Sequence, residues 1–143
     1  MQTYKSSSSS ETKEMGRALG EALLKRGSGR TATVVTLSGE LGAGKTTFTK
    51  GIYQGLGSKA AVTSPTFIII RRSKNLFHVD LYRLRDASAL DVLAFAEIIK
   101  DPKNIVIVEW PELAKKLLPK KLVQVTLHHG RSEHERRITI KGL

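Results

Sequence analysis

A glycine-rich stretch carries the residues in this chain best suited to chemistry. Residues 39–46 read GELGAGKT, which matches the phosphate-binding pattern G-x-x-x-x-G-K-[ST]. Glycines allow positive φ and close approach to a ligand, and consecutive N–H groups in such a turn face phosphate oxygens. Lys45 supplies a cation for the β- and γ-phosphates, and Thr46 offers a hard oxygen ligand for Mg²⁺. The pattern predicts a site for ATP or ADP with magnesium.

The segments on either side of this stretch favour the same function. TATVVTL at 31–37 predicts a buried strand, and a helix is expected from about Lys45 to Leu56, with its positive N-terminal end facing the anion. This context disfavours an accidental glycine-rich turn. The residues predicted to bind nucleotide are Gly39, Glu40, Leu41, Gly42, Ala43, Gly44, Lys45, Thr46, Thr47, Ser64 and Thr66.

A magnesium–nucleotide site also needs a carboxylate from outside the loop, and Glu109 is the first choice. IVIV at 105–108 predicts a buried strand that ends at this acid. Because ligands lie at the carboxyl ends of strands in an α/β sheet, Glu109 is expected to emerge beside Thr46. There it would contact magnesium, directly or through water, or orient the attacking water. The alternative is an ordinary exposed acid at a strand end.

Asp80 ends another predicted strand. Residues 66–72 and 76–80 indicate an antiparallel hairpin, which would bring Asp80 close to the hydroxyl-rich stretch 63–66. That arrangement suits a segment that senses the γ-phosphate or positions water. A turn capped by Ser64 and Asp80 is an equally good interpretation. The predicted catalytic residues are Asp80, Glu109 and Lys45. The four histidines show no tidy metal-ligand spacing and are interpreted as solvated or packed.

The rest of the chain predicts a flexible segment at 1–10 and one domain at 11–143. Ser8 and Glu11 have the spacing of a capping box. The helix that follows is expected to carry its apolar face on Met15, Leu19, Leu23 and Leu24 and to end at 27–29. Further helices are predicted at 86–100 and from Pro111 towards Leu118. The last two strands are expected at 122–127 and 137–140.

Composition limits the class of protein. With no cysteine among 143 residues, disulfides and cysteine-ligated metals are excluded. No apolar run approaches the ~20 residues of a membrane span, and the polar N-terminus does not read as a secretory signal, so a cytoplasmic protein is expected. The net charge of +11 attracts polyanions. Contact with nucleic acid, direct or within a complex, is as good an interpretation as a solvated basic surface.

Four segments taken together resemble the bacterial TsaE (YjeE) family: GELGAGKTTF at 39–48, TSPTF at 63–67, HVDLYRL at 78–84 and VEWPE at 108–112. The resemblance implies a P-loop fold with three α/β/α layers and a mixed central sheet. By position, it implies that 41–46 bind phosphates, that Thr46 and Glu109 hold magnesium, and that Asp80 and 64–66 act near the γ-phosphate. It places adenine near 8–12.

The same resemblance implies a function. TsaE proteins are ATPases that support the TsaB–TsaD pair in the threonylcarbamoyladenosine modification of tRNA beside the anticodon. TsaD carries out the transfer, and hydrolysis supports multiple turnovers of the complex. Weak hydrolysis that a partner raises is therefore expected here, with tRNA reached through the complex. The rivals are a small metabolite kinase, for which Arg71–Arg72 and Arg131–Arg137 would supply lid arginines, and a binding module switched by nucleotide.

Overall fold

The computed structural model describes residues 1–62, 69–92 and 94–143. Within these ranges, seven strands form one mixed sheet with the order β1-β7-β6-β2-β5-β4-β3. The contacts divide the chain into two compact units. In its described parts, the first comprises Met1–Gly27, Ser38–Ser64 and Val125–Lys141, and the second comprises Ser28–Leu37, Pro65–Gln124 and Gly142–Leu143. The predicted α/β class with a mixed sheet is confirmed.

The second unit contains the strands that end in acids. β5 (Ile105–Glu109) runs parallel to both β2 (Thr33–Gly39) and β4 (Leu76–Asp80). β3 (Ile70–Ser73) runs antiparallel to β4, so the predicted hairpin is confirmed over its described part. Residues 66–68, where the first strand was expected to begin, lie outside the described residues.

Short helices cover one face of these strands. Val34, Val79 and Val108 are fully or nearly fully buried in a cluster with residues of α3 (Ala89–Val92), α4 (Phe95–Lys100) and the 3-10 helix η1 (Pro111–Leu117). The single helix predicted at 86–100 is wrong, because Ala94 adopts φ 54° between α3 and α4. Residues five apart point about 140° away from each other on a continuous helix. The break lets both Leu90 and Phe95 reach the cluster.

The first unit begins with a strand where the sequence predicted a flexible segment at 1–10. β1 (Gln2–Ser6) pairs antiparallel with β7 (Arg136–Lys141), which follows β6 (Val123–His129). Residues 2–5 of β1 are exposed, so the strand has no alternating apolar pattern that a sequence reading could detect. The strand forms because its backbone pairs with β7, which a sequence pattern does not show.

The helix that follows, α1 (Ser9–Arg26), is capped as its sequence predicts. The Ser8 hydroxyl accepts a bond from the Glu11 N–H at 3.1 Å, and the Glu11 carboxylate accepts one from the Ser7 N–H at 2.6 Å. The apolar face differs from the expectation. Leu24 is 55% exposed, and the buried residues are Thr12, Gly16, Leu19, Gly20 and Leu23.

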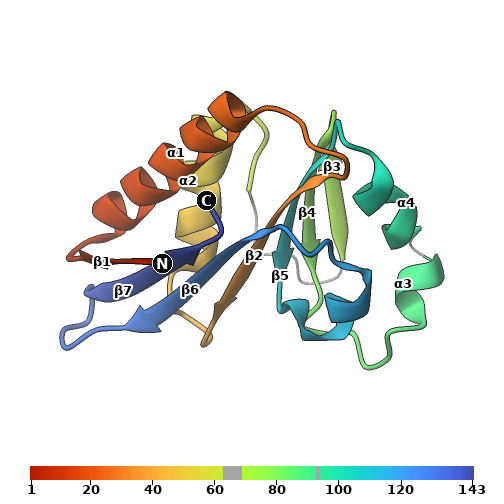
Figure 1. The fold of residues 1–143 in the computed structure, drawn as a ribbon. Helices are drawn as coiled ribbons and strands as arrows, with labels where there is room; N and C mark the ends of the chain where they lie inside the picture. Colours follow the sequence, from red (N-terminus) through yellow and green to blue (C-terminus); the bar gives the residue numbers. More distant parts are fainter. Residues whose placement is uncertain (63–68, 93) are drawn as a thin grey trace. The chain divides into compact units, whose positions relative to one another are not determined.

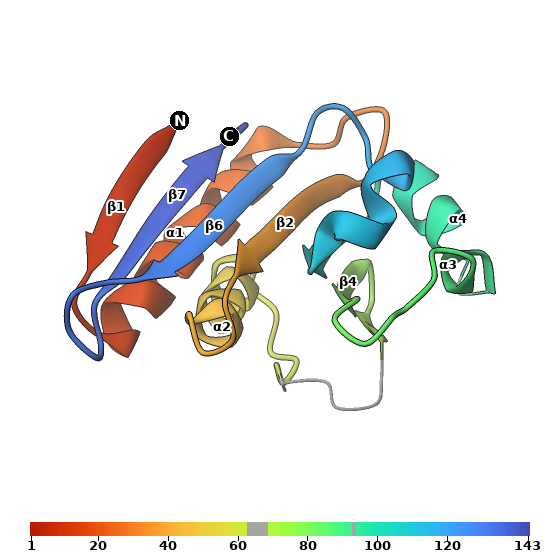
Figure 2. The same ribbon diagram turned by 90° about the horizontal axis from the view of Figure 1, so that it is seen from below.

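Two glycines in that list mark the contact with α2 (Lys45–Gly55). The two helices lie side by side against β1, β7 and β6 (Figure 1 and Figure 2). A Cβ atom added at Gly16 would lie 2.2 Å from the Phe48 carbonyl oxygen, and one added at Gly51 would lie 2.0 Å from the Lys13 carbonyl oxygen. Gly20 and Gly55 make equally close backbone contacts. Because α2 begins at Lys45, this packing positions the start of α2 against the start of α1.

We expect Gly51→Ala to lower the free energy of unfolding by about 1–3 kcal/mol, because the methyl group overpacks the contact between α1 and α2. Gly29→Ala is the matched control, since a Cβ there meets nothing within 4 Å. Urea unfolding followed by circular dichroism measures both. Equal midpoints for the two variants would show that the helices do not pack as closely as described.

Candidate nucleotide-binding site

The predicted glycine turn joins β2 to α2. Gly39, Gly42 and Gly44 have φ of 151°, 77° and 99°, a region that side chains other than glycine disfavour. At Gly39 a side chain is also excluded sterically, because a Cβ would lie 2.5 Å from the Leu127 carbonyl oxygen. Gly44 is the N-cap of α2, so the helix amides begin directly after the turn. The predicted loop conformation, hereafter the loop (residues 39–46), is therefore confirmed.

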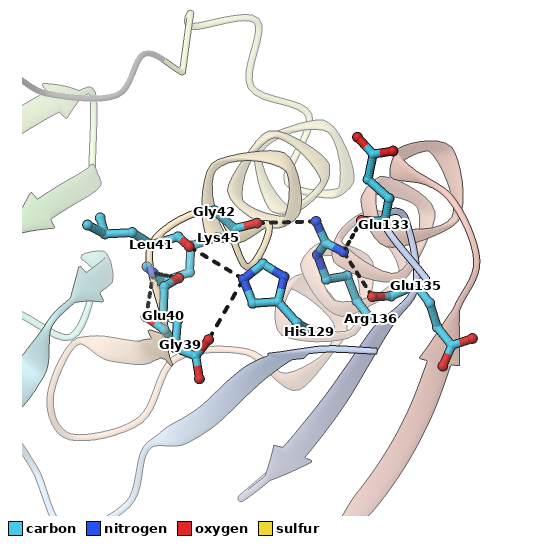
Figure 3. Close-up of polar contacts among 9 residues, drawn as sticks. All are labelled: Gly39, Glu40, Leu41, Gly42, Lys45, His129, Glu133, Glu135 and Arg136. Atoms are coloured by element: carbon cyan, nitrogen blue, oxygen red, sulfur yellow. Dashed lines mark hydrogen bonds and ion pairs between the residues drawn. The ribbon is translucent and has the colours of Figure 1, made fainter. Parts of the chain in front are cut away.

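Lys45 points back into this loop. Its ammonium donates to the carbonyl oxygens of Gly39 at 2.6 Å and Glu40 at 2.8 Å, and the residue is only 7% exposed (Figure 3). A buried lysine is stable only where acceptors surround its charge. The Lys45 ammonium therefore lies on the side of the loop to which the Glu40 carbonyl points.

The hairpin between β6 and β7 contacts the same loop (Figure 3). Arg136 donates to the Gly42 carbonyl oxygen at 3.2 Å, and His129 lies 3.4 Å from the Leu41 carbonyl oxygen and 3.8 Å from the Glu40 carboxylate. Sequence reasoning missed the contacts of both side chains. It interpreted His129 as solvated or packed and considered Arg136 only as part of a kinase lid. No pattern in the chain marks them, because hairpin and loop meet only in the folded protein.

The hairpin turn itself is held by charges. Glu135 accepts a bond from the Arg131 N–H at 3.2 Å and lies 3.1 Å from the Lys5 ammonium on β1. These two contacts hold the pKa of the Glu135 carboxyl below its ordinary value. The carboxylate therefore stays ionised near neutral pH and ties the turn to β1.

A polar pocket of about 110 Å³ adjoins the loop. It is lined by Ser9 and Thr12 of α1, Gly42 and Gly44 of the loop, Thr47 of α2, and His134 and Arg136 of the hairpin. The segment 8–12, where adenine was expected, therefore contributes two residues to a cavity beside the loop.

The predicted acids lie together in the second unit. Asp80 and Glu109 are register partners at the ends of β4 and β5, and Leu37 is the partner of Glu109 on β2. Glu109 is 4% exposed, so the alternative of an ordinary exposed acid is wrong. Asp80 accepts a bond from the Tyr82 N–H at 2.9 Å, as a turn-capping residue does. Ser64 and Thr66 lie outside the described residues.

Glu109 has a buried partner that the sequence did not reveal. The His78 Nε2 lies 2.7 Å from a Glu109 carboxylate oxygen, and the two side chains are 2% and 5% exposed. The spacing of His78 and Asp80 could have indicated this partner, because residues two apart share a strand face. His78 and Asp80 therefore face the same way on β4, beside Glu109 on β5. The bond fixes the orientation of the carboxylate within the sheet.

Comparisons with known proteins identify the family of the chain. A model of the family "Threonylcarbamoyl adenosine biosynthesis protein TsaE" matches residues 6–138. The chain belongs to the TsaE family. A TsaE protein of Bacillus subtilis is 40% identical over 77% of this chain and 70% of the relative, and one of Streptomyces coelicolor is 36% identical over 92% and 90%. Both are named tRNA threonylcarbamoyladenosine biosynthesis proteins.

A solved structure also matches. The crystal structure of Bacillus subtilis YdiB superposes with a TM-score of 0.73 and 32% identity, covering 97% of this chain and 83% of that one. This match agrees with the P-loop α/β fold that the sequence predicted. Within the described ranges, no helix has the length and apolar character needed to cross a membrane.

We expect His78→Leu to lower the free energy of unfolding by about 1–3 kcal/mol, because the buried Glu109 carboxylate loses a hydrogen bond. The double variant His78→Leu with Glu109→Leu should lose less than the sum of its single variants, since both polar partners are then replaced. Urea unfolding of the four proteins measures this coupling. His128→Leu, at an exposed histidine, is the control, and strict additivity would contradict an interaction between His78 and Glu109.

Proposed function

We propose that this protein is a magnesium-dependent ATPase that supports the TsaB–TsaD complex in the threonylcarbamoyladenosine modification of tRNA. The observation that carries the proposal is the loop: glycines at positive φ, a lysine folded into the turn and a helix that begins behind it, in a chain of the TsaE family. A loop of this form can surround a triphosphate with N–H donors.

Phosphate binding follows from the charges of the loop. The N-terminus of α2 presents amides and the positive end of its dipole. The Lys45 ammonium, which contacts two carbonyl oxygens, would exchange them for oxygens of the β- and γ-phosphates. Charge-assisted bonds to phosphate are stronger than bonds to neutral carbonyls. This exchange gives ATP and ADP an advantage over nucleotides with fewer phosphates.

The proposed magnesium ligands are Thr46, from the start of α2, and Glu109, from the end of β5. Both residues are proposed as ligands because the chain belongs to the TsaE family, and the resemblance to that family implies them. Mg²⁺ commonly takes its other ligands from phosphates and water. Bound magnesium would neutralise charge that develops on the phosphates.

Glu109 and Asp80 are the residues proposed to position or activate the attacking water. His78 occupies one oxygen of Glu109, so the other oxygen would face magnesium or the attacking water. Asp80, the register partner of Glu109, would act near the γ-phosphate with Ser64 and Thr66. Hydrolysis without partners is expected to be slow, because a side chain that stabilises the transition state is often supplied in trans.

The biological role is proposed from the family. Relatives at 35–40% identity are named for threonylcarbamoyladenosine biosynthesis, and ATP hydrolysis would reset the TsaB–TsaD complex between rounds of modification. The net charge of +11 suits a protein that works beside tRNA in the cytoplasm. Release of free phosphate with no acceptor would distinguish this role from that of a kinase.

Lys45→Ala should weaken the affinity for ATP with magnesium on the order of 100-fold, because it removes the cation that faces the β- and γ-phosphates. Isothermal titration calorimetry measures the dissociation constant. Lys50→Ala, at an exposed position on the same helix, should leave it unchanged. In a mixture of TsaB, TsaD and tRNA, the Lys45 variant should fail to support repeated rounds of modification. Normal affinity and turnover in that variant would refute the site.

Glu109→Ala should lower the rate of ATP hydrolysis at least tenfold while changing nucleotide affinity by less, because an acid that positions magnesium or water acts mainly in the transition state. Steady-state phosphate release and calorimetry separate the two effects. The control is Glu112→Ala, an exposed acid three positions along the chain. An unchanged rate in the Glu109 variant would move the role to Asp80.

A further inference from the structure

Two consecutive carbonyl groups of the loop are held by side chains of the β6–β7 hairpin. Arg136 donates to the Gly42 carbonyl oxygen at 3.2 Å, and His129 lies 3.4 Å from the Leu41 carbonyl oxygen (Figure 3). We infer that Arg136 and His129 are positioning residues of the nucleotide site, which turn the amides of the loop towards the phosphates. This inference rests on the proposed function and assigns the hairpin a part in it.

Peptide geometry connects the carbonyl contacts to the amides. A trans peptide is planar and carries its C=O and N–H on opposite edges. Holding the Gly42 carbonyl on one side therefore turns the Ala43 N–H to the other side, and holding the Leu41 carbonyl does the same for the Gly42 N–H. These are the amides expected to face phosphate oxygens.

The loop shows the result of this arrangement at Ala43. Its N–H donates to the Glu40 carbonyl oxygen at 3.1 Å, and that same oxygen accepts a bond from the Lys45 ammonium at 2.8 Å. The Ala43 amide thus points to the side where the lysine lies, while the Gly42 carbonyl points to Arg136. The phosphates would meet both donors on that side.

Packing alone does not impose this orientation. Gly42 has φ 77°, and the nearest atom to a Cβ added there is a ring carbon of His129 at 3.9 Å. A glycine with open space around it can rotate its peptides at little steric cost. The side chains of Arg136 and His129 therefore act together with the turn bond from Ala43 to Glu40 to select one orientation among several, and this preorganisation reduces the entropy lost on binding.

Arg136 is itself well anchored for this task. Its guanidinium donates to the carbonyl oxygens of Glu133 at 2.7 Å and Glu135 at 2.9 Å, within the hairpin turn. Among the described residues, no carboxylate forms an ion pair with it. The planar guanidinium can bridge turn and loop at once because its donors are fixed in a fork. It also leaves a positive charge beside the pocket that Gly42 and Gly44 line.

The test compares Arg136→Ala with Arg137→Ala, which removes the same charge from the next, exposed position of β7. Calorimetry with Mg-ADP and with inorganic tripolyphosphate should give dissociation constants about tenfold higher for Arg136→Ala and unchanged values for Arg137→Ala. The tripolyphosphate arm matters because it lacks a nucleoside. A loss for ADP alone would mean that Arg136 contacts the nucleoside, which would overturn the inference.

Amide chemical shifts distinguish a change at these two amides from a general loss of stability. In the wild-type protein, ADP should shift the ¹⁵N–¹H resonances of Gly42 and Ala43 strongly, and in Arg136→Ala these shifts should be at least halved while the Lys45 resonance still moves. Arg136→Lys, which keeps the charge without the fork, should be intermediate and carries the test if the alanine variant does not fold. His129→Ala should reduce mainly the Gly42 shift.

The outcomes separate this inference from the proposed function. Absence of ADP binding in the wild-type protein would refute the nucleotide site itself. Wild-type binding together with wild-type affinity and amide shifts in Arg136→Ala would leave the site intact and overturn the role of the hairpin.

Discussion

The proposed nucleotide site depends on one backbone constraint: the loop must turn its amides inward while passing through conformations that only glycine adopts freely. Gly39, Gly42 and Gly44 meet the constraint at positive φ. Each glycine also adds conformational freedom that the fold must remove. The surrounding structure removes it with Lys45 inside the turn and with Arg136 and His129 on two of its carbonyl groups.

The elements next to the loop are fixed by close backbone contact. Glycines on α1 and α2 bring the two helices together at distances that a methyl group would violate. Because α2 starts at Lys45 and α1 starts near the polar pocket, this contact determines how the walls of the pocket meet the loop. The glycines are therefore needed because they let the two helix backbones approach each other closely.

The two acids at the strand ends are held by hydrogen bonds. Glu109 is buried, and a buried carboxylate is costly unless hydrogen bonds compensate it. His78 supplies one such bond from the neighbouring strand. In the proposed function, this bond limits the orientations available to Glu109, so that the carboxylate is already aligned when nucleotide arrives. Asp80 is held in a similar way by the Tyr82 amide, through a local turn rather than a cross-strand bond.

Local sequence patterns predict the features that depend on neighbours along the chain. The loop, the cap at Ser8, the strands that end at Asp80 and Glu109 and the hairpin from β3 to β4 all follow from local patterns. Tertiary structure alone decided the strand at Gln2–Ser6, the break at Ala94, the bond from His78 to Glu109 and the contacts of Arg136 with the loop. The reason is physical: residues from opposite ends of the chain, such as Gln2 and Ile140, meet in the folded protein, and neither hydrophobic period nor spacing encodes which distant groups become neighbours.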